Sequence, residues 1–255
     1  MEKLIIAVKR FGKDAAGDDI FRQVCDDPAM MELCTFCSAE DKAADAQVIV
    51  PSAEPVKCPA DATEIIVTDK TNFMPLAQEP TAEDIIRLRD IMERDFDLRL
   101  PRIAIVQESP MQNPELASQV TAEQGINTYG PYKAEQIIEG SQACHFDCIV
   151  IPEGSDLVAK LSPDVSVRYF AGRELVVTVV CPPALKEETE DGLADVSAWT
   201  HPIYTAIDIV RNRARYDQAR QNPLPKLYHD KREDRRKDNT QQTSDKAPEP
   251  ASQEE

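Results

Sequence analysis

Glycine and histidine are both scarce in this sequence, with 8 and 3 residues respectively among 255. The few glycines form no G-x-G-x-x-G or Walker phosphate loop, and no G-x-S-x-G serine motif occurs, which excludes nucleotide and hydrolase sites of those types. Long apolar runs are also missing, because the N-terminal run Leu4–Val8 is too short for a signal peptide or a membrane span. We therefore expect a cytoplasmic protein.

Basic residues are fewer than acidic ones, with 29 Lys and Arg against 46 Asp and Glu and a formal net charge of −17. A field of this sign repels nucleic-acid phosphates and anionic lipids, so we expect neither nucleic acid nor a membrane as a partner. A small phosphorylated ligand remains open, because a few local donors outweigh a global charge that salt screens. Seven cysteines, an odd number, indicate reduced thiols.

Short β-rich segments alternate with helical patterns, which predicts an α/β fold with strands joined by crossover helices. The predicted strands are Leu4–Lys9, Glu64–Thr68, Arg102–Gln107, Cys148–Ile151, Ser166–Phe170 and Leu175–Val180. The predicted helices are Thr81–Phe96 with a capping box from Thr81 to Asp84, Asn113 to Gly125, and Pro202 to Arg220. In the last helix we expect one apolar face with Ile203, Ile207, Val210 and Ala214. We expect Arg211, Arg213 and Arg215 to be largely turned outward.

The composition predicts one α/β domain over residues 1–229 and a disordered charged tail over residues 230–255. The tail contains almost no apolar residue whose burial would offset the entropy of ordering it. The mixed-charge stretch Lys231–Lys237 is an alternative docking element, although we favour a solvated tail.

Three segments carry a resemblance to a known family. They read HPIYTAIDIVRNRARYDQARQNPLPK (His201–Lys226), PTAEDIIRLRDIMERDFDLRLPRIAIV (Pro80–Val106) and GINTYGPYKAEQI (Gly125–Ile137). Together they resemble the 4-hydroxythreonine-4-phosphate dehydrogenase family of pyridoxal phosphate biosynthesis, as a shortened and divergent member. Weaker matches cover Leu4–Cys37 and Glu64–Asn72.

The resemblance implies a three-layer α/β/α fold of the isocitrate and isopropylmalate dehydrogenase type, truncated, with two lobes that share mixed sheets and a cleft between them. It also implies a homodimer. Members of the family use NAD and a divalent metal held by three histidines, and the metal polarises the hydroxyl that is oxidised.

The metal-binding histidines of that family have no counterpart here. The segment with the first one is deleted between Asn72 and Thr81, Met111 stands in place of the second, and Gly154 stands in the third motif. A thioether is a poor ligand for hard or borderline divalent ions. The histidines that remain, which we do not expect to rebuild a triad, are His145, His201 and His229.

Some residues of the family's site are retained. By the resemblance, Thr68, Asn72 and Lys160 are candidates for binding the substrate, with Lys160 near its phosphate. Glu153 and Asp156 are weak candidates for a magnesium site, since that ion needs few protein oxygens. For both acidic residues we favour a solvated loop. The N-terminal segment Phe11–Gly17 keeps one glycine of the family's glycine-rich motif.

Cys34 and Cys37 form a C-x-x-C pair, which is typical of a redox pair or half of a zinc site. The candidates for the missing zinc ligands are Cys144, His145 and Cys148. We favour a simpler interpretation, in which Met31–Cys37 is a strand and its cysteines are small buried residues.

Three functional hypotheses follow. The first is a non-catalytic protein that acts by binding or as the partner of a true family enzyme, with no confident catalytic residue or cofactor. The second is an active NAD-dependent dehydrogenase of vitamin B6 biosynthesis with a rebuilt site, whose candidate residues are Asp69, Lys70, Glu153, Asp156 and Lys160. The third is an interaction protein that docks a partner through its tail.

Overall fold

The computed structural model describes residues 3–10, 22–38, 43–50, 56–140, 142–162, 166–180 and 197–222. The chain divides into a unit of residues Met1–Tyr216 and a second unit, Asp217–Glu255. The fold presented below is that of the first unit. The predicted tail with Lys231–Lys237, His229, and the N-terminal segment Phe11–Gly17 lie outside the described residues.

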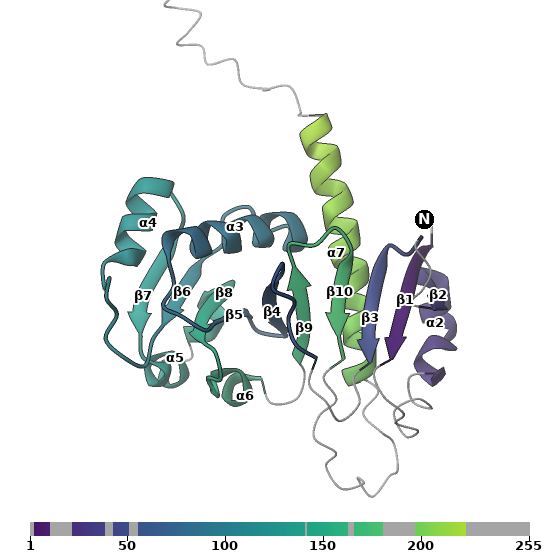
Figure 1. The fold of residues 1–255 in the computed structure, drawn as a ribbon, viewed down its shortest axis with the longest axis horizontal. Helices are drawn as coiled ribbons and strands as arrows, with labels where there is room; N and C mark the ends of the chain where they lie inside the picture. The colour runs from purple at the N-terminus through teal and green to yellow at the C-terminus, as the bar shows by residue number, and fades with distance from the viewer. Residues whose placement is uncertain are drawn as a thin grey trace, which may run out of the picture. The chain divides into compact units, whose positions relative to one another are not determined.

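A ten-stranded mixed sheet runs through the first unit, in the order β2-β1-β3-β10-β9-β4-β5-β8-β6-β7 (Figure 1). Strand β9 is antiparallel to both of its neighbours, and β4 and β5 form an antiparallel pair, while the remaining pairs are parallel. The strands are β1 (Leu4–Arg10), β2 (Cys34–Ser38), β3 (Ala46–Val50), β4 (Thr63–Thr68), β5 (Asn72–Leu76), β6 (Ile103–Val106), β7 (Thr128–Tyr132), β8 (Cys148–Pro152), β9 (Ser166–Ala171) and β10 (Val176–Val179).

The six predicted strands are confirmed as β1, β4, β6, β8, β9 and β10, each to within one residue at its ends. The sequence analysis missed β3, β5 and β7. The predicted strand Met31–Cys37 was wrong in its first half, since α2 (Pro28–Leu33) precedes β2. Asp27 caps this helix by accepting a hydrogen bond from the Ala29 N–H, and Pro28 occupies its first turn, where a missing N–H costs nothing.

The predicted helix with a capping box is confirmed as α3 (Ala82–Phe96), in which Thr81 and Asp84 exchange both hydrogen bonds of the box. Helix α4 (Leu116–Gln124) begins later than predicted, because Asn113 Oδ1 accepts the Glu115 N–H in a turn before it. It ends, as predicted, at Gly125, whose φ of 68° is left-handed.

The last helix, α7 (Ser197–Gln221), begins before the predicted start and contains Pro202. Ile203 and Ile207 are buried as predicted. Two predictions on this helix were wrong. Ala214 is exposed, because the buried part of α7 ends at Ile209, and Arg213 turns inward to a buried carboxylate.

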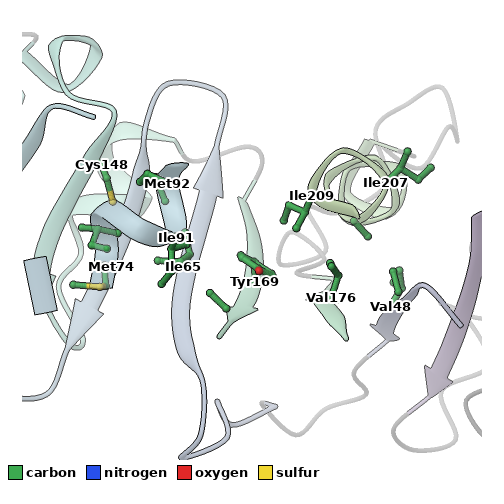
Figure 2. Close-up of a cluster of buried hydrophobic side chains, with 14 of the residues drawn as sticks. Val48, Ile65, Met74, Ile91, Met92, Cys148, Tyr169, Val176, Ile207 and Ile209 are labelled. Carbon is green, nitrogen blue, oxygen red and sulfur yellow. The ribbon is translucent and has the colours of Figure 1, made fainter. Parts of the chain in front are cut away.

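Helices lie on both faces of the sheet. Successive residues of a strand point to opposite faces, so both faces carry apolar side chains that helices cover. On one face, Met74, Ile105 and Val150 belong to the main core with residues of α2, α3, α4 and α7. Their neighbours in sequence point to the other face, where α5 (Ala134–Glu139), the 3-10 helix η1 (Gln142–His145) and α6 (Leu157–Leu161) pack. Figure 2 shows α7, which carries Ile207 and Ile209, next to the strands that carry Val48 and Val176. The three-layer α/β/α arrangement is therefore present.

No helix among the described residues combines the length and apolar character that crossing a membrane requires.

Candidate functional site

Thr68, one of the predicted substrate-binding residues, is used within the turn between β4 and β5. Its hydroxyl donates to the Thr71 carbonyl at 2.7 Å and accepts the N–H groups of Lys70 and Thr71, both at 3.3 Å. A threonine at the end of a strand often closes a turn in this way, since its side chain competes for local backbone groups. The described contacts of Thr68 are therefore structural.

The two residues after Thr68 join this turn to the end of α6. The Lys70 ammonium donates to the Leu161 carbonyl at 2.6 Å, and the Asp69 carboxylate accepts from the Ser162 hydroxyl at 3.1 Å. Lys70 thus satisfies a carbonyl in the last turn of a helix, where a cation is favoured by the helix dipole. The structure brings Asp69 and Lys70 to the helix that carries Lys160.

Asn72 begins β5 and is only 9% exposed. Its amide group donates to the Met92 sulfur at 3.7 Å and to the Asp147 carbonyl at 3.3 Å. Its own N–H donates to the same carbonyl at 3.2 Å. These contacts tie the start of β5 to the residue before β8, so the described donors of Asn72 serve the sheet.

Lys160 lies on α6 and pairs with Asp156 at 2.7 Å, with the two side chains 53% and 63% exposed. The hydrogen bond with Asp156 raises the pKa of Lys160, and the nearby charges of Glu135 and Glu108 act in the same direction. Asp156 precedes the helix without capping it. Lys160 is therefore a surface group with carboxylates around it.

Acidic residues follow the carboxyl ends of the parallel strands β5, β8, β6 and β7, which lie at the same end of the sheet. We call this set the carboxylate rim: Glu79, Glu108, Glu135, Glu153 and Asp156. Open α/β sheets bind ligands at the carboxyl ends of their strands. Negative charge there opposes the approach of a phosphate group.

The residues at the family's metal positions do not fit a divalent ion. Met111 packs its side chain against the main core, and Gly154 has no side chain and a left-handed φ of 80°. The Glu153 N–H donates to the Leu76 carbonyl at 2.8 Å, which fixes the turn after β8. Within the described part of the chain, no group of three or more His, Cys, Asp or Glu side chains is arranged to hold a metal.

The cysteines proposed as zinc ligands lie far apart. Cys34 and Cys37 are on β2, at one edge of the sheet, whereas Cys148 is on β8, seven strands away. At about 4.8 Å per strand the separation is roughly 34 Å, which excludes a shared zinc ion. Burial raises the pKa of the Cys34 thiol to about 11, although Arg211 and Lys3 oppose it. A thiol that stays protonated at neutral pH is a poor nucleophile, so a redox role is not supported either.

The sequence analysis missed a buried ionic cluster around Asp95, in the last turn of α3. The Asp95 carboxylate is fully buried and receives the guanidinium groups of Arg94 at 2.7 Å and Arg213 at 2.8 Å. The Tyr169 hydroxyl of β9 donates to it at 2.6 Å and accepts from Arg213 at 2.7 Å. We call these four residues the Asp95 cluster.

Electrostatics in the Asp95 cluster favour its charged form. Burial alone would raise the pKa of Asp95, but hydrogen bonds from Arg94 and Arg213 outweigh it and hold that pKa below its ordinary value. Burial and the charge of Asp95 raise the pKa of Tyr169, so its hydroxyl remains a donor. The cluster is saturated with internal partners and joins α3, β9 and α7. It is a structural site.

Comparisons with known proteins agree with this fold. The chain is 31% identical over 174 residues to the 4-hydroxythreonine-4-phosphate dehydrogenase of Bacteroides thetaiotaomicron, a region that covers 62% of this chain and 48% of that protein. The chain thus matches about half the length of this relative. No family model matches the sequence.

Two solved structures represent the similar folds. A β-decarboxylating dehydrogenase from Thermococcus kodakarensis superposes with a TM-score of 0.51 at 8% identity, covering 89% of this chain and 99% of that one. An isocitrate dehydrogenase from Methylococcus capsulatus gives a TM-score of 0.47 at 12% identity, covering 86% and 89%.

The fold is therefore a three-layer α/β/α fold of the isocitrate dehydrogenase type, as the sequence predicted. Over the 174 matched residues, the chain is similar to a 4-hydroxythreonine-4-phosphate dehydrogenase. The resemblance found in its sequence is confirmed.

Proposed function

We propose that this protein does not carry out the metal- and NAD-dependent oxidation of its relatives and acts instead by binding, as a homodimer or as a partner of a true family enzyme in the cytoplasm. The observation that carries the proposal is the replacement of the metal-ligand positions. Met111 is partly buried and packs against the main core, and the side chain of Gly154 offers no donor atom. Activation of a hydroxyl for hydride loss needs a Lewis acid or a base in contact with it.

The retained site residues support the same conclusion through their contacts. Thr68 and Asn72 direct their described hydrogen bonds to the backbone of their own sheet and to Met92. Lys160 is paired with Asp156. A phosphate would have to displace this carboxylate and approach the rest of the carboxylate rim, so strong binding of a phosphorylated substrate is disfavoured.

An active dehydrogenase with a rebuilt site is the second candidate, and one observation favours it. Asp69 and Lys70 contact the end of α6, the helix that also carries Lys160. Two lysines and several carboxylates thereby gather around one short helix. Such a set offers a base and an anion partner, although Lys70 is bound to the Leu161 carbonyl at 2.6 Å.

The decisive experiment is an assay of NAD reduction with 4-phosphohydroxy-L-threonine, run with Zn²⁺, Mg²⁺, Mn²⁺ or Co²⁺, alongside the Bacteroides thetaiotaomicron enzyme as a positive control. We expect no turnover above the buffer rate from the purified protein. Metal-dependent NADH formation that Lys160→Met or Lys70→Met abolishes would establish the second candidate. Turnover that neither variant changes would indicate a contaminating enzyme, and the non-catalytic function would still stand.

Ligand binding without turnover is tested by thermal unfolding. A ligand present at 100 times its Kd stabilises a folded protein by about 2.7 kcal/mol, which moves the melting temperature by several degrees. We expect no shift with NAD or divalent metals. A complex with a family enzyme, detected by light scattering as a larger mass in the mixed proteins, would support the partner role.

A further inference from the structure

Two parts of helix α7, residues 199–209 and residues 210–216, are held to the sheet by different interactions. From Trp199 to Ile209 it buries a stripe of apolar side chains in the main core: Trp199, Ile203, Ala206, Ile207 and Ile209. From Val210 to Tyr216 no residue is fully buried. The second part therefore obtains little of its stability from apolar burial, which normally supplies most helical stability in proteins.

Arg213 occupies the next place on the buried stripe, one helical turn after Ile209. Its guanidinium is bound on every side, to the Asp95 carboxylate at 2.8 Å, the Tyr169 hydroxyl at 2.7 Å, and the carbonyls of Arg173 and Glu174 at 3.0 and 2.8 Å. The side chain is 13% exposed. One residue thus connects α7 to α3, to β9 and to the turn before β10.

Helix α3 carries a buried charge at a similar place. Its buried stripe of Ile85, Leu88 and Met92 continues to Asp95, three residues after Met92. The neighbour of Arg213, Asn212, donates its side-chain amide to the Asp95 carbonyl at 2.8 Å. Each helix therefore closes its apolar stripe with a polar residue, and the two polar ends meet.

We propose that Arg213 is a latch that holds residues 210–216 of α7 against the sheet, so that this segment opens as a local unit when the latch is removed. Without Arg213, Asp95 and Tyr169 lose a buried partner, and the carbonyls of Arg173 and Glu174 lose a donor. Val210 packs against the main core while only partly buried, and Asn212 keeps its hydrogen bond to the Asp95 carbonyl, but no fully buried apolar side chain holds residues 210–216. The first part of α7 stays in place because its apolar stripe does not depend on Arg213.

Hydrogen–deuterium exchange on the full-length protein tests the latch. For Arg213→Leu we expect exchange in peptides covering residues 210–216 to rise at least tenfold, with peptides from residues 199–207, β3 and β10 changed less than twofold. Arg215→Leu is the matched control. That arginine is 66% exposed and contacts Asn212 and Asp97, and its removal should leave residues 210–213 protected.

Arg213→Lys provides a second variant in case Arg213→Leu does not fold. The lysine retains the charge but cannot donate to all four acceptors, so exchange in residues 210–216 should rise by a smaller factor with the rest unchanged. Equal acceleration across the whole unit would overturn the proposal, because Arg213 would then be a general stabilising residue. Unchanged exchange in residues 210–216 of either folded variant would overturn it as well.

Discussion

Asp95 and Lys160 are both charged groups in ion pairs, yet their surroundings differ completely. Asp95 is fully buried and bound by two arginines and a tyrosine, whereas Lys160 is 53% exposed and has one described ion-pair partner. The buried charges around Asp95 hold the scaffold together, since they join α3, β9 and α7. Lys160, which the sequence matched to the family's site, makes one ion pair at the surface among the described residues.

The physical reason for this difference is solvation. A buried carboxylate has lost its water and must be compensated by the protein, so each partner is required. A surface pair is screened by water and salt, and either member can change at little cost. Groups of the second kind are free to diverge once a catalytic role is lost.

Removal of the buried carboxylate should have the largest effect. Asp95→Ala leaves Arg94, Arg213 and Tyr169 without their common partner, and we expect the free energy of unfolding to fall by about 3–5 kcal/mol. Urea denaturation at pH 7 measures this. Asp90→Ala, on the same helix but 60% exposed, should change it by no more than about 0.5 kcal/mol. Equal losses for both variants would show that burial of Asp95 does not increase its contribution to the free energy of unfolding.

Acid should remove the same contribution in the intact protein. Because the folded pKa of Asp95 is lowered, its stabilisation is complete above the unfolded value of about 3.9 and is lost as pH falls through the folded value. We expect the urea midpoint to decrease below pH 4, and to decrease less in Asp95→Asn, which has no proton to take up. A variant with the same pH dependence as the native protein would contradict this assignment.

The smallest effect is expected for Lys160→Met. Because this side chain is exposed and paired only at the surface, the urea midpoint should not change, and binding of inorganic phosphate measured by calorimetry should be equally weak in both proteins. Loss of measurable phosphate binding in the variant would show that Lys160 has kept the family's role.

The strands found from the sequence are rich in apolar and β-branched residues over their predicted spans. Two of the missed strands contain proline, which usually excludes an interior strand. In β5, Pro75 is tolerated because the pairing of β5 with β4 stops at Phe73, so no hydrogen bond on that side is lost. In β7, Pro131 lies on the edge strand of the sheet. The third, β3, has the β-branched run Val48–Val50 and could have been found.

The Asp95 cluster was missed because helical patterns were read from apolar residues alone. A signal was present, since Asp95 lies three residues after Met92 on the buried stripe of α3, and Arg213 lies four after Ile209 on that of α7. A charge on an apolar stripe indicates a buried partner. The sequence pattern of one helix does not show which other helix it packs against. The partner of each buried charge is therefore set by tertiary packing.

We propose that the scaffold was kept while the groups able to bind a divalent ion were replaced. Anomalous diffraction from crystals grown with Mn²⁺ and NAD tests this proposal. We predict no ordered ion held by protein atoms near Met111, Gly154 or the carboxylate rim. An anomalous peak coordinated by side chains of the carboxylate rim or near Met111 and Gly154, from one subunit or two, would contradict the proposal.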